Sequence, residues 1–414
     1  MSDAALRPFR LADVDAVGAL CEWAWWPPRS REGWRWLMAG PSGSSLQGPA
    51  GWVCERDGEV VAFVGNFIQH LWRHGERFDL ATGHSLLVRP DARGLSRNLL
   101  NVFIQQPVLA RYTFNCNALS APLYGRYGMR PWPGPLASIK YVWRVDPVRV
   151  LTERMVWGLE RRRGFSGARR TERFCPDRLW DPRPARWRPG VRQMASEEVG
   201  EAFDRFWARL SQEGRPVATR DAAAIRWRLG DPDLTRPPIL LAHEADGEIA
   251  GYLLAFFSKQ SQIEFPTLEI VDLIALRGHE GRAIPALVRS LVRGARRMGA
   301  ARVRLSMVNP RLEPLVADVE GGRRVTGHVH AHVRFAEDAP ADLISDWYAT
   351  PYDGDHSFCV RAPPRPDGAA PGGLRLGAPR SGQSRHDRCE PTGNAPRRRP
   401  ETDHVEPVST PLRG

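Results

Sequence analysis

One order of secondary-structure signals occurs twice along this chain of 414 residues. In each copy a strand and a helix come first, followed by a hairpin of two strands, a further strand, a second helix and another strand. Apolar residues at alternate positions mark the strands, and apolar residues spaced by about one helical turn mark the helices. A supersecondary plan that is used twice predicts two domains of the same architecture.

The first copy occupies residues 1–147. Its clearest signals are Arg56-Asp57-Gly58-Glu59, where Asp-Gly favours a tight hairpin turn, and a helix over residues 97–109 with one apolar side. The other expected elements are strands over residues 6–9, 52–55, 60–67, 78–88, 113–116 and 139–145, and helices from Leu11 and over residues 120–127.

The second copy occupies residues 189–360 and contains a similar hairpin through Ala245-Asp246-Gly247. We expect each domain to be an α/β (α+β) unit with a mixed, mostly antiparallel sheet flanked by helices. The other expected elements of this copy are strands over residues 191–194, 268–276 and 302–308, and helices over residues 199–210 and 283–298.

Two further segments differ from the domains in composition. Residues 148–188 are rich in Arg, Pro and Trp, and are predicted to be a connector with one amphipathic helix at its start. Residues 361–414 are rich in Pro, Gly, Arg and Ser and contain few large apolar side chains. Such a segment cannot bury enough apolar surface to offset its ordering entropy, so we expect a disordered tail.

The composition is that of an ordinary globular protein, with 42% hydrophobic and 26% charged residues. The longest apolar stretches, such as residues 249–257, have the length of strands, whereas a membrane span needs about 20 apolar residues. The first residues lack the pattern of a signal peptide, and a cytoplasmic location is therefore expected. The six cysteines are scattered without zinc-site spacing, so no metal is expected.

The net charge is +12 and the isoelectric point is about 10.1, which taken alone suggests an acidic partner such as nucleic acid. Almost all of the positive charge is arginine, since lysine occurs only at Lys140 and Lys259. The arginines are spread along the chain rather than confined to one stripe, and such a bias can come from a GC-rich genome. The charge pattern therefore does not favour nucleic-acid binding.

The segment from Asn117 to Met129, NALSAPLYGRYGM, resembles a motif of the GNAT superfamily of acyl-CoA-dependent N-acyltransferases. That motif, N-x-x-[SA]-x-x-L-Y-x-x-x-G-[FM], follows the fifth strand of the family fold. The opening at residues 6–10 and the hairpin at residues 55–63 also resemble the family. The resemblance covers most of residues 6–145 and, less closely, residues 191–336, and it implies two GNAT-like domains in tandem.

The resemblance implies that the fourth and fifth strands of a domain part from one another, and that acyl-CoA lies along the fourth strand with its pyrophosphate at the start of the next helix. Free amides and the helix dipole favour an anion at such a helix start. The residues expected to contact the acyl-CoA are Leu87, Val88, Arg93, Gly94, Leu95, Ser96, Arg97 and Asn117 in the first domain, and Gly281 and Ala283 in the second.

Each copy departs from the family pattern V-x-P-x-x-R-G-x-G-[LI]-G-x-x-L-[LM] in a different way. In the first copy the loop that begins at Arg93 is shorter than the pattern, and Ser96 stands where a glycine is usual. In the second copy Gly281-x-Ala283 fits the core of the pattern, but no L-Y-x-x-x-G-F segment follows Asn309. If one domain is active, we expect it to be the first.

Acyl transfer to an amine needs a base for the amine, donors for the oxyanion and an acid for the leaving thiolate. The resemblance assigns the acid to Tyr124, whose alternative role is packing. His84, on the expected fourth strand, is the candidate base, because histidine titrates near neutral pH; its alternative role is that of a core histidine. Glu269 and Asp272 occupy the comparable strand of the second copy, where Asp272 could equally be structural.

Several tryptophans lie where the resemblance places the acceptor lobe, and they could form either an aromatic wall for the acceptor or part of the core. They are Trp23, Trp25, Trp26, Trp34 and Trp36 in the first copy and Trp227 in the second. The expected function is N-acyl transfer, with acetyl-CoA as the expected donor, to a small-molecule or protein amine that the sequence does not identify. The alternatives are an inactive double-GNAT binding scaffold and an aminoacyl- or sugar-modifying transferase of cell-envelope assembly, which need not use CoA.

Overall fold

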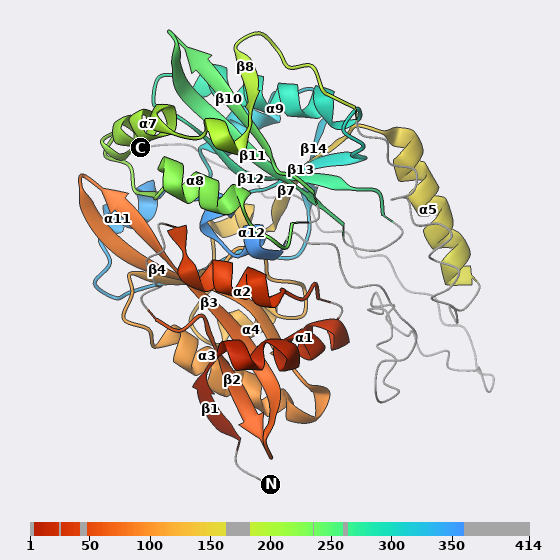
Figure 1. Ribbon diagram of the computed structural model, residues 1–414, viewed down its shortest axis with the longest axis vertical. Coiled ribbons are helices and arrows are strands. Elements are labelled where there is room, and N and C mark those ends of the chain that lie inside the picture. Colours follow the sequence, from red (N-terminus) through yellow and green to blue (C-terminus); the bar gives the residue numbers. More distant parts are fainter. Residues whose placement is uncertain are drawn as a thin grey trace, which may run out of the picture. The chain divides into compact units, whose positions relative to one another are not determined.

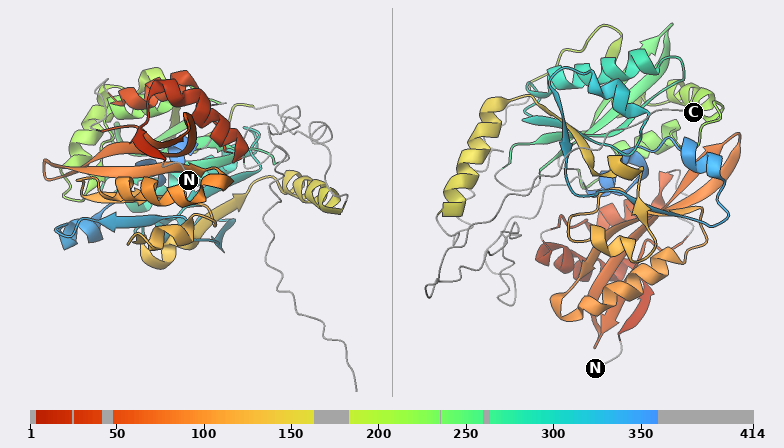
Figure 2. Two further views of the ribbon diagram at one scale, coloured as in Figure 1. Left: turned by 90° about the horizontal axis from the view of Figure 1, so that it is seen from below. Right: turned by 180° about the vertical axis from the view of Figure 1, so that it is seen from behind.

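The computed structural model describes residues 4–24, 26–41, 48–162, 183–234, 236–259 and 264–359, and all of them belong to one compact unit. Their strands form two sheets (Figures 1 and 2). Residues 163–182 of the expected connector (148–188) and the expected tail at residues 361–414 lie outside the described residues, as does Trp25. No helix in the described part of the chain is long and apolar enough to cross a membrane.

The first sheet has the strand order β1-β2-β3-β4-β5-β15-β6, and a short strand, β9, pairs with β3 as well. The pairing is antiparallel except between β4 and β5, which run parallel. Its strands are β1 (Ala5–Pro8), β2 (Gly51–Arg56), β3 (Glu59–Arg73), β4 (Glu76–Val88), β5 (Ala110–Thr113), β6 (Arg130–Pro131), β9 (Val217–Ala218) and β15 (His332–Phe335).

The second sheet has the order β14-β7-β13-β12-β11-β10-β8, and here β12 and β13 form the parallel pair. Its strands are β7 (Ile139–Arg144), β8 (Val191–Met194), β10 (Ile239–Ala245), β11 (Glu248–Ser258), β12 (Thr267–Ala275), β13 (Arg302–Ser306) and β14 (Gly322–Thr326). The expected hairpin turns are present, since Asp57 and Gly58 in the first sheet, and Asp246 and Gly247 in the second, have the positive φ angles that such turns require.

The two copies exchange one strand each. The strand expected at residues 139–145 as the last of the first domain is β7, which lies between β13 and β14 in the second sheet. In return β15, from the second half of the chain, lies between β5 and β6 in the first sheet. The assignment of residues 139–145 to the first sheet is therefore corrected: alternating apolar residues identify a strand but not the sheet whose open edge it completes.

Helices flank both sheets, so the expected fold class is confirmed. In the first half, α1 and α2 cover one face of the sheet and α3 covers the other (Figure 2). The helices are α1 (Val14–Trp23), α2 (Arg31–Ala39), α3 (Ser96–Ile104), α4 (Ala121–Gly125), α5 (Pro147–Arg162), α7 (Glu201–Ser211), α8 (Ala222–Leu229), α9 (Glu280–Ala295), α10 (Leu312–Ala317), α11 (Ala341–Asp346) and α12 (His356–Cys359).

Side chains from the two halves contact each other directly. The rings of Trp36 on α2 and Trp227 on α8 are stacked with centroids 4.2 Å apart, and each indole N–H donates to the backbone carbonyl of the other residue. Arg29 forms a buried ion pair with Asp231 at 2.9 Å. These contacts hold α2 and α8, the helices that follow the first helix of each copy, against one another.

Candidate functional site

The first sheet opens at the parallel pair. β4 and β5 are paired only from Leu80–Thr82 to Ala110–Tyr112, after which β4 continues to Val88 while β5 ends at Thr113. A bulge lies on β4 at this point: Ser85 has a φ of 52°, and the register with β3 shifts between Phe63 and Gly65. We call this opening, between residues 83–88 and residues 114–117, the first divergence.

The side of the first divergence that faces α3 and α4 is apolar and partly open to solvent. Leu86 and Val88 on β4 are half-buried there, as are Leu95, Leu123 and Tyr127 around them. Leu87 points the other way, into the core under α1 and α2, so only its backbone is available on this side.

Tyr124 lies on α4, which borders the first divergence. Its side chain is buried, and its ring centroid is 5.6 Å from that of His332 on β15. Asn117 shapes the turn before α4, because its Oδ1 accepts hydrogen bonds from the amides of Leu119 (3.0 Å) and Ser120 (2.9 Å). The Asn117 side chain therefore orders the turn that carries Tyr124.

Cys116 lies three residues after the end of β5, which the structure places at Ala110–Thr113 rather than at the expected residues 113–116. Its thiol donates to the carbonyl of Val329 at 3.1 Å, and its Sγ is 3.4 Å from Nδ1 of His332. Burial raises the pKa of the Cys116 thiol to about 12, and burial also lowers the pKa of His332. Both side chains are therefore neutral near pH 7.

His84 lies on β4 directly before the bulge, on the face covered by α1 and α2. Its Nδ1 is 3.2 Å from Oγ of Ser85, and that oxygen also accepts the indole N–H of Trp26 at 3.1 Å. The ring stacks near Trp34 and lies so close to Gly65 that a Cβ there would fall 2.2 Å from it. His84 and Tyr124 thus approach the first divergence from opposite faces of the sheet.

The expected phosphate loop is a 3-10 turn (Pro90–Leu95) that runs directly into α3. The amide of Ser96 bonds back to the carbonyls of Arg93 and Gly94, and its hydroxyl donates to the carbonyl of Arg93 at 3.0 Å. The side chains of Arg93 and Arg97 are exposed, and no carboxylate among the described residues pairs with either of them. The loop therefore presents two unpaired cations beside the exposed backbone of Gly94.

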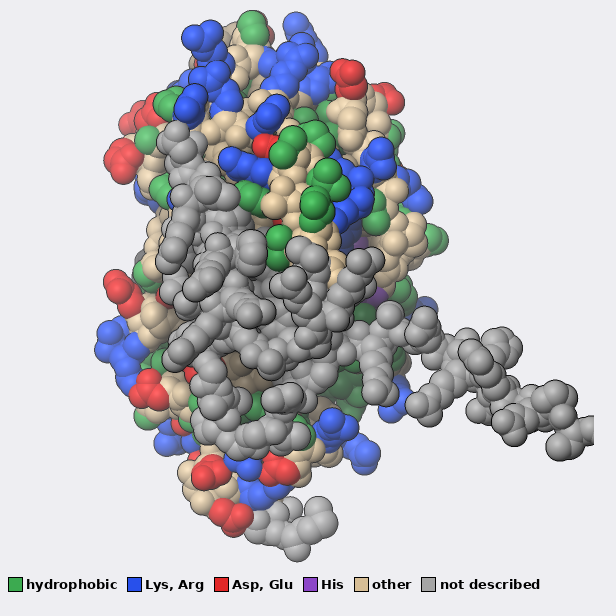
Figure 3. All heavy atoms as spheres, turned by 90° about the vertical axis from the view of Figure 1, so that its right-hand side faces the viewer, with side chains coloured by type: hydrophobic (Ala, Val, Ile, Leu, Met, Phe, Trp, Pro, Cys, Tyr) green, Lys and Arg blue, Asp and Glu red, His purple; other side chains and the backbone are tan. Residues whose placement is uncertain are grey.

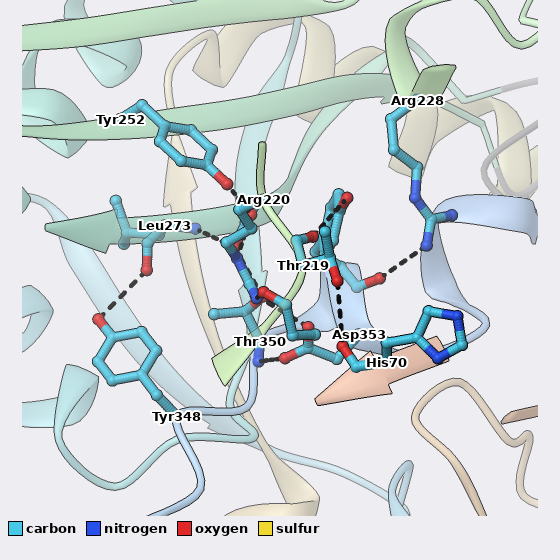
Figure 4. A network of polar contacts seen from close by, with 12 residues as sticks. His70, Thr219, Arg220, Arg228, Tyr252, Leu273, Tyr348, Thr350 and Asp353 are labelled. Carbon is cyan, nitrogen blue, oxygen red and sulfur yellow. Dashed lines mark hydrogen bonds and ion pairs between the residues drawn. The ribbon is translucent and has the colours of Figure 1, made fainter. Parts of the chain in front are cut away.

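The second sheet has a comparable opening, the second divergence, where β12 runs past the end of its pairing with β13 at Ile270 and Leu305. Unlike the end of β4, every residue of β12 is buried. The hydroxyl of Tyr348 donates to the carbonyl of Leu273 at 3.3 Å, and Thr350 bonds to Asp272 at 2.7 Å (Figure 4). The chain itself therefore fills the second divergence.

A charged network fixes residues 348–353 in the second divergence. Arg220 is fully buried and pairs with Asp272 and with Asp353, each at 2.9 Å, and it also donates to Thr350 (Figure 4). Tyr252 donates its hydroxyl to the same Asp272 carboxylate. All the acceptor atoms of Asp272 thus face residues of the protein, which supports its structural role.

The other carboxylate considered in the second copy, Glu269, is held in the same way. It pairs with Arg304, accepts the hydroxyl of Ser258 at 3.0 Å and lies 3.6 Å from His356. Although burial alone would raise it, the pKa of Glu269 is held well below its usual range by Arg304 and His356. A carboxylate held in its ionised form this strongly is a weak base.

Carboxylates of the protein already occupy the helix start that corresponds to the phosphate loop in the second copy. Glu280 lies in the first turn of α9 and pairs with the buried Arg215. Glu213 pairs with the same arginine at 2.8 Å and accepts the amide of Arg277 at 2.7 Å. Gly281 is exposed beside them, and the side chain of Ala283 is buried in the core.

Three of the tryptophans expected at the acceptor lobe, Trp34, Trp36 and Trp227, pack against other rings. Trp34 is buried against Phe9 and Phe63, with centroids 4.6 and 5.6 Å away, and Trp36 and Trp227 form the stacked pair between the halves. Trp26 differs, because it is half-buried and bonds to Ser85 at the bulge. Core packing therefore accounts for Trp34, Trp36 and Trp227.

Residues 347–359 form a part of the site that was not predicted from the sequence. Asp355 accepts hydrogen bonds from the amide of Phe114 (2.7 Å) and the hydroxyl of Thr113 (3.1 Å), at the end of β5. Phe358 packs 5.9 Å from His84, and the carbonyl of Phe358 accepts from Arg29. A run that combines aromatic and acidic residues directly before a polar, proline-rich segment was the available signal.

Among the described residues, no group of three or more His, Cys, Asp or Glu side chains is placed to hold a metal ion. No protein-family model matches this chain, and no curated protein matches it.

Several solved structures are similar in fold. One is a probable N-acyltransferase from Enterococcus faecalis V583, with 12% identity, a TM-score of 0.48, and coverage of 81% of this chain and 72% of that chain. Eis1 from Mycobacterium abscessus has 15% identity, a TM-score of 0.44, and coverage of 80% and 73%. N-myristoyltransferase from Saccharomyces cerevisiae, solved with bound myristoyl-CoA, has 12% identity, a TM-score of 0.47, and coverage of 81% and 78%.

Proposed function

We propose that this protein is a GNAT-type N-acyltransferase that moves an acyl group from acyl-CoA to an amine at the first divergence. The observation that carries the proposal is the difference between the two openings. The first has half-buried apolar residues along β4, and Arg93 and Arg97 at the following helix pair with no carboxylate among the described residues, whereas the second is filled by Tyr348 and Thr350. An elongated thiol ester with a pyrophosphate suits an apolar strand edge that leads to free cations.

The residues of the first divergence fit such a substrate in several respects. The exposed backbone of Gly94 leaves room for close approach, since a Cβ there would meet nothing within 4 Å. Leu86, Val88 and Leu95 offer apolar contact to a pantetheine arm. Ser96, which was expected to contact the acyl-CoA, has less to offer a phosphate because its hydroxyl already donates a hydrogen bond within the turn.

Acyl-CoA would supply the thioester carbon, and the amine nitrogen would form an amide bond to it as the carbon–sulfur bond breaks. We propose that Tyr124 protonates the leaving thiolate from the side of α4. We propose that His84, reaching the same opening from the other face of the sheet, accepts the proton of the amine directly or through water. Acetyl is the proposed acyl group, and a small-molecule or protein amine is the proposed acceptor.

We propose two GNAT-like domains, in residues 1–147 and 189–360, with the amendment that each is completed by a strand of the other. An inactive binding scaffold is the second candidate, and one observation favours it: the amide that heads α3, that of Ser96, is engaged within the preceding turn rather than open to an anion.

Thermal unfolding with and without acetyl-CoA distinguishes the two candidates. Binding to the folded state alone stabilises it by about 2.7 kcal/mol at a hundredfold excess over Kd, and this raises the melting temperature by several degrees. The double variant Arg93→Ala/Arg97→Ala should lose the rise and Arg277→Ala, at the second loop, should keep it. No rise in the well-folded wild type at millimolar acetyl-CoA or CoA would overturn the enzyme proposal and leave the scaffold.

A further inference from the structure

Helix α5 exposes an apolar stripe. Val148, Leu151 and Met155 are 66%, 57% and 62% exposed, and their spacing places them on one side of the helix. On the opposite side, Val150 packs with Phe265 and Ala301 in a small buried cluster. The helix is therefore attached to the protein by one side and presents apolar residues on the other.

The attachment is specific. The carboxylate of Glu153, one turn from Val150, is buried, accepts the amide of Phe265 at 2.6 Å and pairs with Arg302 on β13. A helix fixed through Val150 and Glu153 cannot turn its stripe inward, so the exposure of Val148, Leu151 and Met155 is a consequence of how α5 is held.

Three exposed arginines lie on α5 or close to its start. Arg154 on α5, Arg144 at the end of β7 and Arg323 on β14 are exposed, and no carboxylate in the described part of the chain pairs with them. They lie close enough to interact: desolvation and the charges of Arg154, Arg323 and Arg302 lower the pKa of Arg144. Figure 3 shows the side of the molecule on which α5 lies, where hydrophobic side chains gather between groups of basic ones.

We propose that this surface, Val148, Leu151 and Met155 with Arg144, Arg154 and Arg323, docks the protein onto an anionic lipid bilayer. Apolar residues on one side of a fixed helix suit shallow insertion among headgroups and acyl chains, and the nearby guanidinium groups suit lipid phosphates and carboxylates. Nucleic acid would satisfy the arginines but would leave the apolar stripe without a partner, because phosphates and sugars dominate such contacts. Three neighbouring exposed apolar residues therefore favour the bilayer.

Co-sedimentation of the full chain with vesicles tests the proposal. We expect binding to vesicles of phosphatidylcholine with about one-third phosphatidylserine, weak binding to phosphatidylcholine alone, and loss of binding at high salt. Leu151→Glu/Met155→Glu and Arg154→Ala/Arg323→Ala should each weaken binding about tenfold or more. Leu6→Glu, an exposed leucine on β1, is the matched control and should bind as the wild type does.

Each result of the vesicle experiment either supports the bilayer proposal or overturns it. All five positions substituted, including the control Leu6, are exposed, so unchanged circular dichroism and melting temperature identify folded variants. Comparison within the full chain cancels any contribution of its other arginine-rich segments. The proposal is overturned if the wild type binds neither vesicle, if it binds both equally, or if Leu151→Glu/Met155→Glu binds as tightly as the wild type. Binding of duplex DNA but not vesicles, insensitive to Leu151→Glu/Met155→Glu, would instead identify a nucleic-acid surface.

Discussion

The first and second divergences come from the same plan of strands and helices, yet they differ in what lies in them. At the first, three of the last four residues of β4 are half-buried, whereas at the second every residue of β12 is buried. A backbone carbonyl of β12, that of Leu273, already accepts a hydroxyl from the protein. Repetition of a fold therefore does not imply repetition of a binding site.

The starts of the helices that follow the two openings carry opposite charges, and this difference also favours anion binding at the first divergence. The start of α3 has Arg93 and Arg97, which pair with no carboxylate in the described part of the chain, and the start of α9 has Glu280 and the nearby Glu213, which both pair with Arg215. A carboxylate in the first helical turn uses the favourable dipole that an anionic ligand would otherwise use. We interpret the second half as a structural support for the first half. The exchanged strands β7 and β15 favour the same interpretation.

The largest effect that this comparison predicts is on stability at the second divergence. Arg220→Ala leaves Asp272 and Asp353 buried without their cation, which should lower the free energy of unfolding by about 3–5 kcal/mol. Arg93→Ala, at the first divergence, should change it by no more than about 0.5 kcal/mol, because that side chain is exposed and unpaired. Urea unfolding monitored by circular dichroism measures both. A loss of stability below about 1 kcal/mol for Arg220→Ala would show that the Arg220 network does not hold residues 348–353 in the second divergence.

The second prediction concerns turnover and compares two tyrosines. Tyr124→Phe should lower kcat of the proposed reaction about 100-fold, the lower end of what a positioned acid contributes, with little change in acyl-CoA affinity. Tyr348→Phe should leave kcat unchanged and lower stability by about 1 kcal/mol, because it loses only the bond to Leu273. A panel of amines with acetyl-CoA is first screened with the wild type to find an acceptor. Steady-state kinetics of both variants with that acceptor then gives the comparison. Equal kcat values in both variants would exclude Tyr124 as the acid.

The third prediction concerns the helix starts. Arg93→Ala and Arg97→Ala should each weaken CoA binding about tenfold, the loss of one charge-assisted contact, and salt should weaken the wild type in the same way. Arg277→Ala, an exposed arginine at the second helix start, should bind CoA normally. Isothermal titration calorimetry at two salt concentrations is the measurement. If only Arg277→Ala weakened CoA binding, the result would place the CoA site at the second divergence instead of the first.

The sequence predicted much of this arrangement. The Asp-Gly hairpins, the helices and the fold class follow from local patterns, and the structure confirms them. The exchange of β7 and β15 could not be predicted, because a strand's own residues do not reveal which open sheet edge it will pair with. The roles of Tyr124 and His84 remain predictions. The filling of the second divergence by Tyr348 and Thr350 depends on contacts distant in sequence, which no local pattern indicates.

The segment that the sequence left unassigned gives the smallest predicted effect. Burial raises the pKa of Asp355 to about 6, above its ordinary value of 3.8. A raised folded-state pKa means that the native protein binds this proton more tightly than the unfolded chain does, so the stability cost of its charge is present above pH 6 and fades as the pH falls. Between pH 7 and pH 5 this group alone should add about 1 kcal/mol to the free energy of unfolding.

Asp355→Asn isolates that contribution, because asparagine keeps an acceptor for the amide of Phe114 but does not titrate. The gain in stability from pH 7 to pH 5, measured by urea unfolding, should be smaller in the variant than in the wild type by about 1 kcal/mol. Carboxylates whose pKa is lowered, such as Glu269, titrate below this window and do not obscure the difference. An equal gain in both proteins would mean that Asp355 is already ionised at pH 5, and that Thr113 and Phe114 hold a carboxylate anion at the first divergence.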